Sequence, residues 1–457
     1  MQEEIKQSKI KKKSREDLSM NDRKWKDQKE FQAYFDQLHP VDIASELEDW
    51  PDEQIDAMCS YLNDEDLASV LDQSDDDERM EVVKHVHDDR LLSLFQWIPK
   101  DEIVDLMGNL PMDRKKRLLN RMKHDEQTII RQLLQYPEES AGGIMTTDYI
   151  ALRLDLKISD ALQTIRDIGP KTEVIETLYV INAKRELIGT VDLRKLLAAN
   201  KEAYISSIME ADAIYVYPEM DQEEVAKLVA KYDLKAIPVV NANKAILGII
   251  TVDDIIDVII DEYDEDLLQM AGVSKEESID TTLLESIQMR LPWLLINLAT
   301  AFLASFIVKI FQTTIEQVVA LSAVMTIVSG MGGNAGTQTM SILVRDLSHG
   351  DIKAKRVWQV LFKEIALGII DGSSTGLVTA IIVYVMYHNV FLSLIVFLAM
   401  IGNLVVAGIF GLLIPVTISK LHADPAIASS IFLTTATDVL GFFIFLGLAT
   451  LFLSHLM

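Results

Sequence analysis

The chain has 457 residues and a formal net charge of −26, with 49% hydrophobic residues and 25% charged residues. This apolar content excludes an intrinsically disordered acidic chain, and the length suggests about three domains of roughly 150 residues. The charge is uneven, because residues 1–287 carry −27 and residues 288–457 carry +1. A surface this acidic disfavours nucleic acid as a partner, since phosphate binding needs a basic footprint, and it favours cations.

The first 27 residues are polar and contain a lysine-rich run from Lys6 to Lys13 without an apolar core after it. This is not the pattern of a signal peptide, and we expect a disordered leader over residues 1–27. Cys59 is the single cysteine, which excludes an internal disulfide and a cysteine-cluster metal site.

Residues 39–122 contain a twelve-residue repeat. Successive blocks open at Pro51, Asn63, Asp75, His87, Pro99 and Pro111. Proline or a capping residue, then acids, then apolar positions at helical spacing predict one short helix in each block. Such a helix cannot bury its apolar face alone, so we expect the units to stack into a helical solenoid domain over residues 28–140.

A second repeat covers residues 141–262, where Ile144-Met145 and Ile208-Met209 are 64 residues apart. Each copy, 141–203 and 204–262, has the pattern of a β-α-β-β-α unit, with about five extra residues between helix and strands in the first. The pair resembles tandem cystathionine-β-synthase-type (CBS) domains. That resemblance makes Thr251 and Asp254 of the string GIITVDDI candidate nucleotide-binding residues, together with Arg194. In the first copy Asp192 and Lys195 stand in the places of the Thr–Asp pair, which departs from the ribose-binding pattern.

An acidic linker helix, broken near Gly272, is expected over residues 263–287, and a membrane domain over residues 288–457. Five apolar segments there can each cross roughly 30 Å of hydrocarbon. They cover about 291–311, 315–342, 359–387, 390–419 and 425–455. The loop RDLSHGDIKAKRV between the second and third is basic, so it should lie in the cytoplasm. Five crossings then place the acidic N-terminal part in the cytoplasm and the C-terminus outside.

An ionisable residue within a membrane segment is a functional hypothesis by default. Asp438 follows Ser430 and Thr434 at four-residue spacing, so two hydroxyls and a carboxylate share one helix face. Oxygen ligands suit a hard cation. The alternative is a Ser/Thr stripe that packs helices, with the aspartate hydrogen-bonded to it.

The second apolar segment ends in SGMGGNAGTQTMS, where four glycines let the backbone unwind or another helix come close. Asn334 and Gln338 lie on roughly one face of this segment. A packing seam and the second wall of a polar path are both open interpretations. In the third segment, Lys363 and Glu364 could pair locally. Asp371 could line the path or be held by Lys363 or by a hydroxyl.

The string VDDIIDVIIDEYDED places eight carboxylates directly before the linker. Such a run is usually a solvated face. Here divalent cations could bridge the acids into a compact arrangement that loosens when the ions leave. His85 and His87 beside Asp88 and Asp89 are a weaker candidate, for a softer metal. The chain has no Walker loop, GxSxG, HExxH or EF-hand pattern, so we do not expect an enzyme.

The strings AGGIMT, GIITVDDIIDVI, GGNAGTQ and DPAIASSIFLTTATDV, in this domain order, resemble the bacterial MgtE-type magnesium channels and related eukaryotic carriers. The resemblance covers about residues 30–457. It implies a multidomain α and α/β membrane protein: cytosolic solenoid, tandem CBS domains, plug helix and five-helix transmembrane domain. It also implies a homodimer in the bacterial cell membrane, surrounded by lipid. Its single pore would be lined by the second and fifth helices, with Asp438 and Asn334 at the filter for hydrated Mg²⁺.

The resemblance further implies regulatory Mg²⁺ sites that close the pore when internal Mg²⁺ is high. They carry over to Glu223, Asp233, Asp254, Asp257, Glu262, Glu265, Asp266, Asp101 and Asp105. Ser69 stands where another acid is expected. ATP is a possible ligand of the CBS pair, because some relatives bind it there.

Three hypotheses follow from the sequence. The first is a magnesium channel gated by magnesium. The second is a channel of the same build for another divalent cation, such as Mn²⁺ or Co²⁺, which oxygen ligands alone do not separate from Mg²⁺. The third is a membrane-anchored nucleotide sensor without transport, against which Asp438 and the polar stripes argue.

Overall fold

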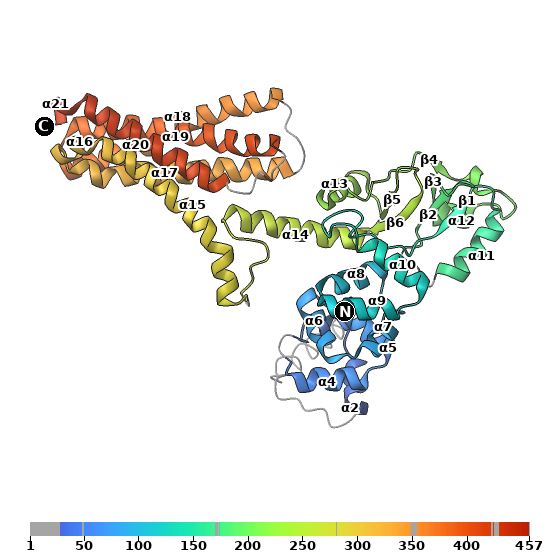
Figure 1. Ribbon diagram of the computed structural model, residues 1–457. Helices are drawn as coiled ribbons and strands as arrows, with labels where there is room; N and C mark the ends of the chain where they lie inside the picture. Colours follow the sequence, from blue (N-terminus) through green and yellow to red (C-terminus); the bar gives the residue numbers. More distant parts are fainter. Residues whose placement is uncertain are drawn as a thin grey trace, which may run out of the picture. The chain divides into compact units, whose positions relative to one another are not determined.

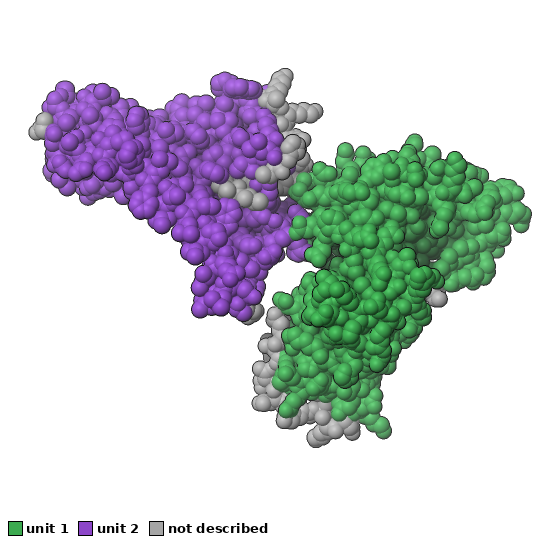
Figure 2. Space-filling view, in the orientation of Figure 1, with its two compact units in different colours: residues 1–259 green, residues 260–457 purple. Residues whose placement is uncertain are grey.

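The structure is a computed structural model that describes residues 28–47, 50–169, 172, 174–279, 281–348, 354–421, 424 and 429–456. The expected leader at residues 1–27 lies outside this part of the chain, as does Lys353 of the basic loop. Two compact units, residues 1–259 and 260–457, are shown in different colours in Figure 2. They are described separately below.

The first unit begins with short helices at the predicted twelve-residue period (Figure 1). They are α2 (Gln28–Phe35), α3 (Pro40–Ala44), α4 (Asp52–Tyr61), α5 (Asp64–Asp72), α6 (Asp76–His85), α7 (Asp88–Leu94), α8 (Lys100–Asn109), α9 (Met112–Arg121) and α10 (His124–Leu133). Each predicted block opens on the N-cap residue of its helix, from Pro51 to Pro111. The period continues one block further than expected, because Lys123 is the N-cap of α10.

Two arginines each connect helices that are three blocks apart in this stack. Arg90 donates to the carbonyl oxygen of Leu62 at 2.7 Å, and Arg114 donates to that of Val86 at 2.6 Å. Both are the fourth residue of their block, and both reach back to the end of the helix three blocks earlier. Helix C-termini leave carbonyls without intrahelical partners, so each arginine satisfies groups that the stacking would otherwise bury.

The second half of this unit has the expected β-α-β-β-α order twice. The first copy holds β1 (Ala151–Arg153), α11 (Ile158–Ile168), β2 (Thr177–Ile181), β3 (Leu187–Asp192) and α12 (Leu193–Ala198). The second holds β4 (Glu210–Ala211), α13 (Gln222–Tyr232), β5 (Ala236–Val240), β6 (Ile246–Thr251) and α14 (Val252–Met270). The expected first strand of the second copy is reduced to an isolated parallel bridge between Val216 and Val239. Helix α14 runs on into the second unit.

The two copies exchange their leading segments. Thr146, ahead of the first strand of the first copy, bridges to Ile249 in β6 of the second copy. Glu210 in β4, 64 residues further on, pairs with Thr190 in β3 of the first copy. A Cβ on Gly248 would lie 2.4 Å from the carbonyl oxygen of Thr146, so this approach requires glycine. The sheet of the first copy therefore has the order β1-β2-β3-β4, with its last strand contributed by the second copy.

The described residues of the second unit form helices joined by loops, without strands. It contains α15 (Leu283–Ile310), α16 (Gln312–Gln317), α17 (Ala320–Ser348), α18 (Ala354–Tyr387), α19 (Val390–Lys420), α20 (Ser429–Leu451) and α21 (Leu453–Leu456). Helix α19 has the most buried residues of these helices and lies at the centre of the bundle. By length and composition, four of the described helices could cross a membrane: α15, α18, α19 and α20. Helix α17 is not among them, so the expected count of five spans stays a prediction.

A glycine seam joins α18 to α19. Gly368, Gly372 and Gly376 follow one another at four-residue spacing on the face of α18 that meets α19. A Cβ on Gly368 would lie 2.8 Å from the carbonyl oxygen of Leu404, and a Cβ on Gly372 would lie 2.7 Å from the Cα of Ile401. Small residues at this spacing allow two backbones to approach closely, as in other membrane helix pairs.

We expect Gly372→Ala to destabilise the second unit by about 1–3 kcal/mol, the usual cost of overpacking. The added methyl group meets backbone, which cannot rotate away. Thermal unfolding of the purified full chain in detergent measures the effect. Gly447→Ala in α20 is the matched control, because a Cβ there meets nothing within 4 Å. Equal unfolding midpoints for the two variants would contradict the seam.

Candidate functional site

Helix α17 presents a polar face that its neighbours leave open. Gly330, Asn334 and Gln338 lie four residues apart on this face, and all three are exposed. On the opposite side, Gly332 and Gly336 are buried against other helices. Amide side chains at membrane depth need polar partners or water, so the open face points to a polar path or to a second subunit.

Asp438 on α20 is hydrogen-bonded to α17. The hydroxyl of Ser329 donates to Oδ1 of Asp438, so the carboxylate contacts α17 five residues before Asn334. Its side chain is partly exposed rather than packed away. The structure thus brings the predicted carboxylate to the wall that carries the predicted amides. Ser329 was missed from the sequence, although it lies one residue before the first glycine of the motif.

The remaining hydroxyls of the α20 stripe bond to their own helix. Thr434 donates to the carbonyl oxygens of Ser430 at 3.0 Å and Ile431 at 3.1 Å. Its side-chain oxygen is exposed and keeps its lone pairs, so it can still accept a hydrogen bond from the water around a cation. The packing alternative for the stripe applies to Thr437, which is fully buried.

The packing interpretation of the glycine motif holds for two of its glycines, and the polar-path interpretation stays a prediction. A Cβ on Gly332 would lie 2.2 Å from Nδ2 of Asn403, and one on Gly336 would lie 2.7 Å from Cδ1 of Leu433, so these two form a packing seam. A Cβ on Gly330 or Gly333 would meet nothing within 4 Å. Helix α17 passes through the motif without unwinding.

The ionisable residues of α18 differ in their surroundings. Glu364 is 8% exposed and accepts a hydrogen bond at 2.8 Å from the Thr339 hydroxyl of α17. Lys363 lies 3.8 Å from Glu364, which agrees with the expected local pair. Asp371 is exposed on α18, and the structure does not place it beside Lys363.

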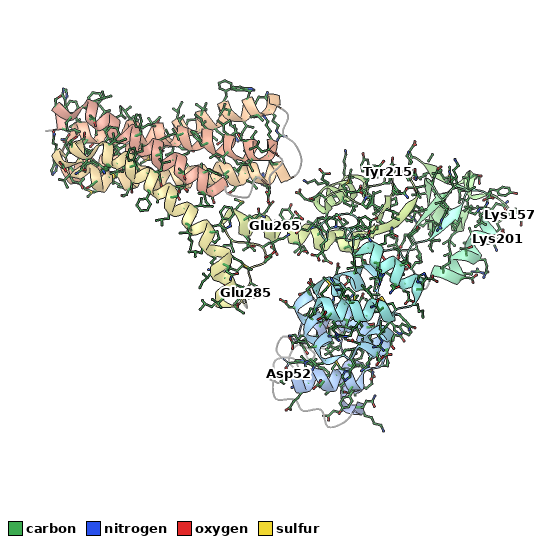
Figure 3. The ribbon with its side chains drawn as sticks, in the orientation of Figure 1. Asp52, Lys157, Lys201, Tyr215, Glu265 and Glu285 are labelled. Atoms are coloured by element: carbon green, nitrogen blue, oxygen red, sulfur yellow. The ribbon has the colours of Figure 1, made fainter. Side chains whose placement is uncertain are left out.

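A cavity of about 350 Å³ lies at the N-terminal end of the α20 stripe. Ser430 and Thr434 line it, together with Arg290 and Trp293 of α15. Arg290 forms an ion pair with Glu277 of the connecting segment. Glu265, a predicted regulatory residue (Figure 3), lines a neighbouring cavity of about 220 Å³ and pairs with Lys275 at 3.0 Å. Glu262 and Asp266 lie on the same part of α14.

A cluster of carboxylates in the first unit surrounds one buried arginine. Arg79 of α6 is 7% exposed and forms an ion pair with Glu102 of α8 at 2.5 Å. Its guanidinium also donates to the carbonyl oxygens of Leu71 at 3.1 Å and Ser74 at 3.0 Å. The carboxylates whose charges act on this group come from α5, α6, α8 and α14: Asp72, Asp76, Glu102, Asp105 and Asp254.

Burial raises the pKa values of several carboxylates in this cluster. It raises the pKa of Glu102 to about 7 and that of Asp105 to about 6, against the opposing charge of Arg79. Burial also raises the pKa of Asp254 and of Asp257, with Asp253 adding to both shifts. One guanidinium therefore does not neutralise the group, and a divalent cation would relieve the remaining repulsion. The structure brings together the predicted residues Asp105, Asp254 and Asp257, and the predicted residue Asp101 is buried on α8.

These shifts predict the effect of pH on the first unit in magnesium-free buffer. Because Glu102 and Asp105 have folded-state pKa values near 7 and 6, the folded state binds more protons than the unfolded state in this range. The free energy of unfolding should therefore rise as the pH falls from 8 to 6. Thermal unfolding of the full chain checks this, with Glu102→Gln as the variant that flattens the slope. A midpoint that rises with pH would contradict the assignment.

Two predicted regulatory residues have other surroundings. Glu223 of α13 pairs with Lys227 at 2.8 Å on its own helix. Asp233 is the C-cap of α13 with a φ of 51°, a left-handed conformation that aspartate tolerates better than most residues. Their role as cation ligands stays a prediction.

The candidate nucleotide-binding residues lie in both CBS copies, and their hydrogen-bond partners differ between the copies. In the second copy, the Thr251 hydroxyl donates to Oδ2 of Asp254, which joins the predicted Thr–Asp pair. In the first copy, Arg194 is bonded to Asp192, which lowers the pKa of Asp192 to about 2, and Lys195 pairs with Glu210. The side chains that replace the Thr–Asp pair in the first copy thus have other partners, Arg194 for Asp192 and Glu210 of β4 for Lys195.

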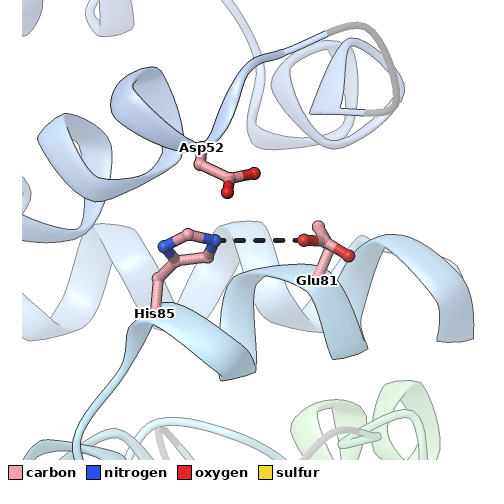
Figure 4. A group of neighbouring side chains, drawn as sticks. All are labelled: Asp52, Glu81 and His85. Atoms are coloured by element: carbon pink, nitrogen blue, oxygen red, sulfur yellow. Dashed lines mark ion pairs between the residues drawn. The ribbon is translucent and has the colours of Figure 1, made fainter.

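Of the two histidines predicted as a metal site, His85 lies in a different group of potential metal ligands. His85 lies with Asp52 and Glu81 on the solenoid surface, with ligand atoms within 4.8 Å of one another (Figure 4). Its Nδ1 bonds to Asp56 at 2.8 Å, and Nε2 lies 3.9 Å from Glu81. His87 is instead the N-cap of α7, so the two predicted histidines do not act together.

Comparison with known proteins gives the same domain order. The family model for MgtE, described as a divalent cation transporter, matches residues 325–448. The model for the MgtE intracellular N domain matches residues 38–139, and the CBS domain model matches residues 141–202 and 205–261.

The magnesium transporter MgtE of Bacillus subtilis is 36% identical over 74% of this chain and 75% of that protein. The magnesium transporter MgtE of Thermus thermophilus is 31% identical over 71% of this chain and 72% of its own. A crystal structure of the cytosolic domain of the Mg²⁺ channel MgtE in complex with ATP has a TM-score of 0.49 and 29% identity, and the match covers 51% of this chain and 95% of that one. With its apolar helices, the chain is a multi-pass membrane protein with a cytoplasmic N-terminal part. These relatives and family matches show that the chain belongs to the MgtE family of divalent cation transporters.

Proposed function

We propose that the chain carries Mg²⁺ across the bacterial cell membrane along a path lined by α17 and α20. The observation that carries this proposal is the hydrogen bond between Ser329 and Asp438, beside the open amide face of α17. A carboxylate, an amide and a threonine oxygen suit a cation that keeps its hydration shell, because Mg²⁺ gives up water reluctantly. Asp438, Asn334, Gln338 and Thr434 are the proposed pore residues.

We propose that two copies complete this path. Asn334 and Gln338 are exposed on α17 within a single chain, and α15 is apolar with few buried residues. A second subunit related by two-fold symmetry would cover the polar face and place two Asp438 carboxylates around one ion. The proposed orientation has the basic loop in the cytoplasm and the C-terminus outside, from the positive-inside rule.

The cytosolic carboxylates are the proposed sensor. Raised pKa values at Glu102, Asp105 and Asp254 indicate an excess of buried negative charge around Arg79. Bound Mg²⁺ would neutralise that excess and hold α8 of the solenoid against the start of α14. High internal Mg²⁺ would then favour the compact, closed state. ATP is a second proposed ligand, on the strength of the Thr251–Asp254 pair alone.

Uptake by the purified full chain in liposomes with an internal Mg²⁺ indicator tests the proposal. Mg²⁺ should enter down its gradient, and the rate should fall when Mg²⁺ is present on the cytoplasmic face. Absence of Mg²⁺ uptake would contradict transport of this ion, and faster uptake of Mn²⁺ or Co²⁺ would assign the path to another cation.

Limited proteolysis across a Mg²⁺ titration tests the gating separately. The acidic linker near residues 262–275 should become protected by Mg²⁺ and not by Na⁺ at equal ionic strength. Cleavage that is indifferent to Mg²⁺ would make the carboxylate run only a solvated face, while leaving the proposed path unaffected.

A further inference from the structure

Asn403 is a polar side chain that the transport path as described does not use. It lies in the middle of α19, the central helix of the bundle, and is 0% exposed. An amide in such surroundings costs free energy unless both its ends have partners. Among the described residues, its Oδ1 has no hydrogen-bond partner. A leucine would fill a similar volume without this cost, so the amide needs a reason.

One end of the amide holds α17. Nδ2 of Asn403 donates to the carbonyl oxygen of Val328 at 2.7 Å. In a helix this oxygen also accepts from the N–H of Gly332, four residues on, and a carbonyl has lone pairs for both bonds. Gly332 leaves the space for the amide, since a Cβ there would lie 2.2 Å from Nδ2. The bond to Val328 also fixes which end of the amide faces α17, because an oxygen in that position would face another oxygen.

The other end of the amide touches α20. A Cβ on Gly441 would lie 2.7 Å from Oδ1 of Asn403, so the side chain rests on the backbone of α20. Gly441 follows Asp438 by three residues, which is less than one helical turn. On α17, Val328 is the residue directly before Ser329. Asn403 therefore contacts both helices within one turn of the bond between Ser329 and Asp438.

We propose that Asn403 is a positioning residue of the pore, which sets the separation of α17 and α20 and thereby the place of the Asp438 carboxylate. This inference rests on the proposed path between those two helices. The amide is rigid and planar, and its volume fixes the distance between α17 and α20. Its one hydrogen bond fixes the position of Val328, and so of α17, along the helix axis relative to α19. A site that selects a hydrated ion by oxygen positions needs its ligands held to about 0.5 Å. Selectivity and affinity should therefore depend on Asn403 although it does not touch the ion.

The test is Mg²⁺ uptake by the full chain in liposomes, with rates normalised to monodisperse protein. Asn403→Leu keeps the volume and removes the hydrogen bond, and Asn403→Asp keeps an oxygen and removes the donor. We expect both to raise the Mg²⁺ concentration for half-maximal uptake by roughly tenfold, the upper range for loss of one hydrogen bond. Both variants should also lower the ratio of the Mg²⁺ uptake rate to the Mn²⁺ uptake rate. Ser393→Ala is the matched control. Ser393 is buried in the same helix, and its hydroxyl donates to the carbonyl oxygen of Asn389, four residues earlier.

A merely structural role predicts a different outcome. Asn403→Leu would then lower the maximal rate in proportion to folded protein, with half-saturation and ion preference unchanged, and that result would overturn the inference. The double variant of Asn403→Leu with Ser329→Ala further separates a positioning role from a merely structural one. If Asn403 acts through the Ser329–Asp438 contact, the two effects do not add. Additive effects would also overturn it. Should Asn403→Leu not fold, the smaller Asn403→Ser carries the same comparison.

Failure of the inference and failure of the proposed path give different results. If Asp438→Ala retains uptake, the path between α17 and α20 is wrong. If Asp438→Ala abolishes uptake and the Asn403 variants behave as Ser393→Ala does, the path stands and only the positioning role falls.

Discussion

Asp438→Ala is expected to abolish Mg²⁺ uptake while leaving the chain folded. The carboxylate is the only acid of α20, and it is hydrogen-bonded to Ser329 of α17. Without it the path keeps amides and hydroxyls but loses the charge that offsets the cost of bringing a dication to membrane depth. Asp438→Asn, which keeps the size of the side chain, should lose uptake nearly as completely. Uptake in liposomes measures both variants.

The control for this experiment is a carboxylate of the same unit outside the path. Glu316 of α16 is exposed and bonds to Gln312 on its own helix, so Glu316→Ala should transport as the unmodified chain does. Size-exclusion profiles show whether each variant is folded. Uptake by Asp438→Asn at the full rate would show that charge at this position is not required, and the ion would have to be held by neutral oxygens alone.

Arg79→Ala is expected to destabilise the first unit by about 3 kcal/mol or more, because it leaves buried carboxylates without their cation. Arg79 is bonded to two carbonyl oxygens and to Glu102, and its charge opposes the raised pKa values of Glu102 and Asp105. Mg²⁺ should recover part of the loss, since a bound dication replaces positive charge at the same place. Thermal unfolding of the full chain, with and without Mg²⁺, measures the effect.

Arg117→Ala is the matched control, since Arg117 is 58% exposed and pairs with Asp88 on the surface. Pairs of this kind contribute about 0–1 kcal/mol. An Arg79 variant as stable as the Arg117 variant would mean that the carboxylates are protonated or hydrated without Arg79. Destabilisation that Mg²⁺ does not reduce would mean that Arg79 does not share its surroundings with a cation site.

The solenoid could be predicted helix by helix because each block begins with its own start signal. The same repeat also contained a signal that was missed. The fifth residue of a block is apolar and buried at Ile55, Leu67, Leu91 and Ile103, whereas the buried Arg79 takes this place in its block and the partly exposed Lys115 takes it in the last predicted block. An arginine at a core position must find buried acids and carbonyls, so the pattern alone indicated where the carboxylate cluster would gather.

The membrane site was predictable in its residue types and not in its contacts. Asp438 and Asn334 were found because polar groups are rare in apolar segments. Which glycines pack and which stay open depends on the rotation of α17 about its axis, and neighbouring helices decide that rotation. Asn403 is also a polar group in an apolar segment, but its role shows only when its two glycine neighbours, 71 residues before and 38 residues after it, are brought beside it.

The exchanged leaders of the two CBS copies bear on how this part of the chain arose. Each copy is completed by a segment that belongs to the other, Thr146 on β6 and Glu210 on β3. A single ancestral copy would have had a sheet edge without a partner strand and a leading segment without a sheet to join. Two such copies could pair these segments with each other only as a symmetric dimer. Duplication and fusion would have turned that pair into one chain, in which either half can diverge in sequence while the exchange keeps the halves together. The replaced Thr–Asp pair of the first copy is divergence of this kind, because the fused partner still supplies the strand that the first copy needs.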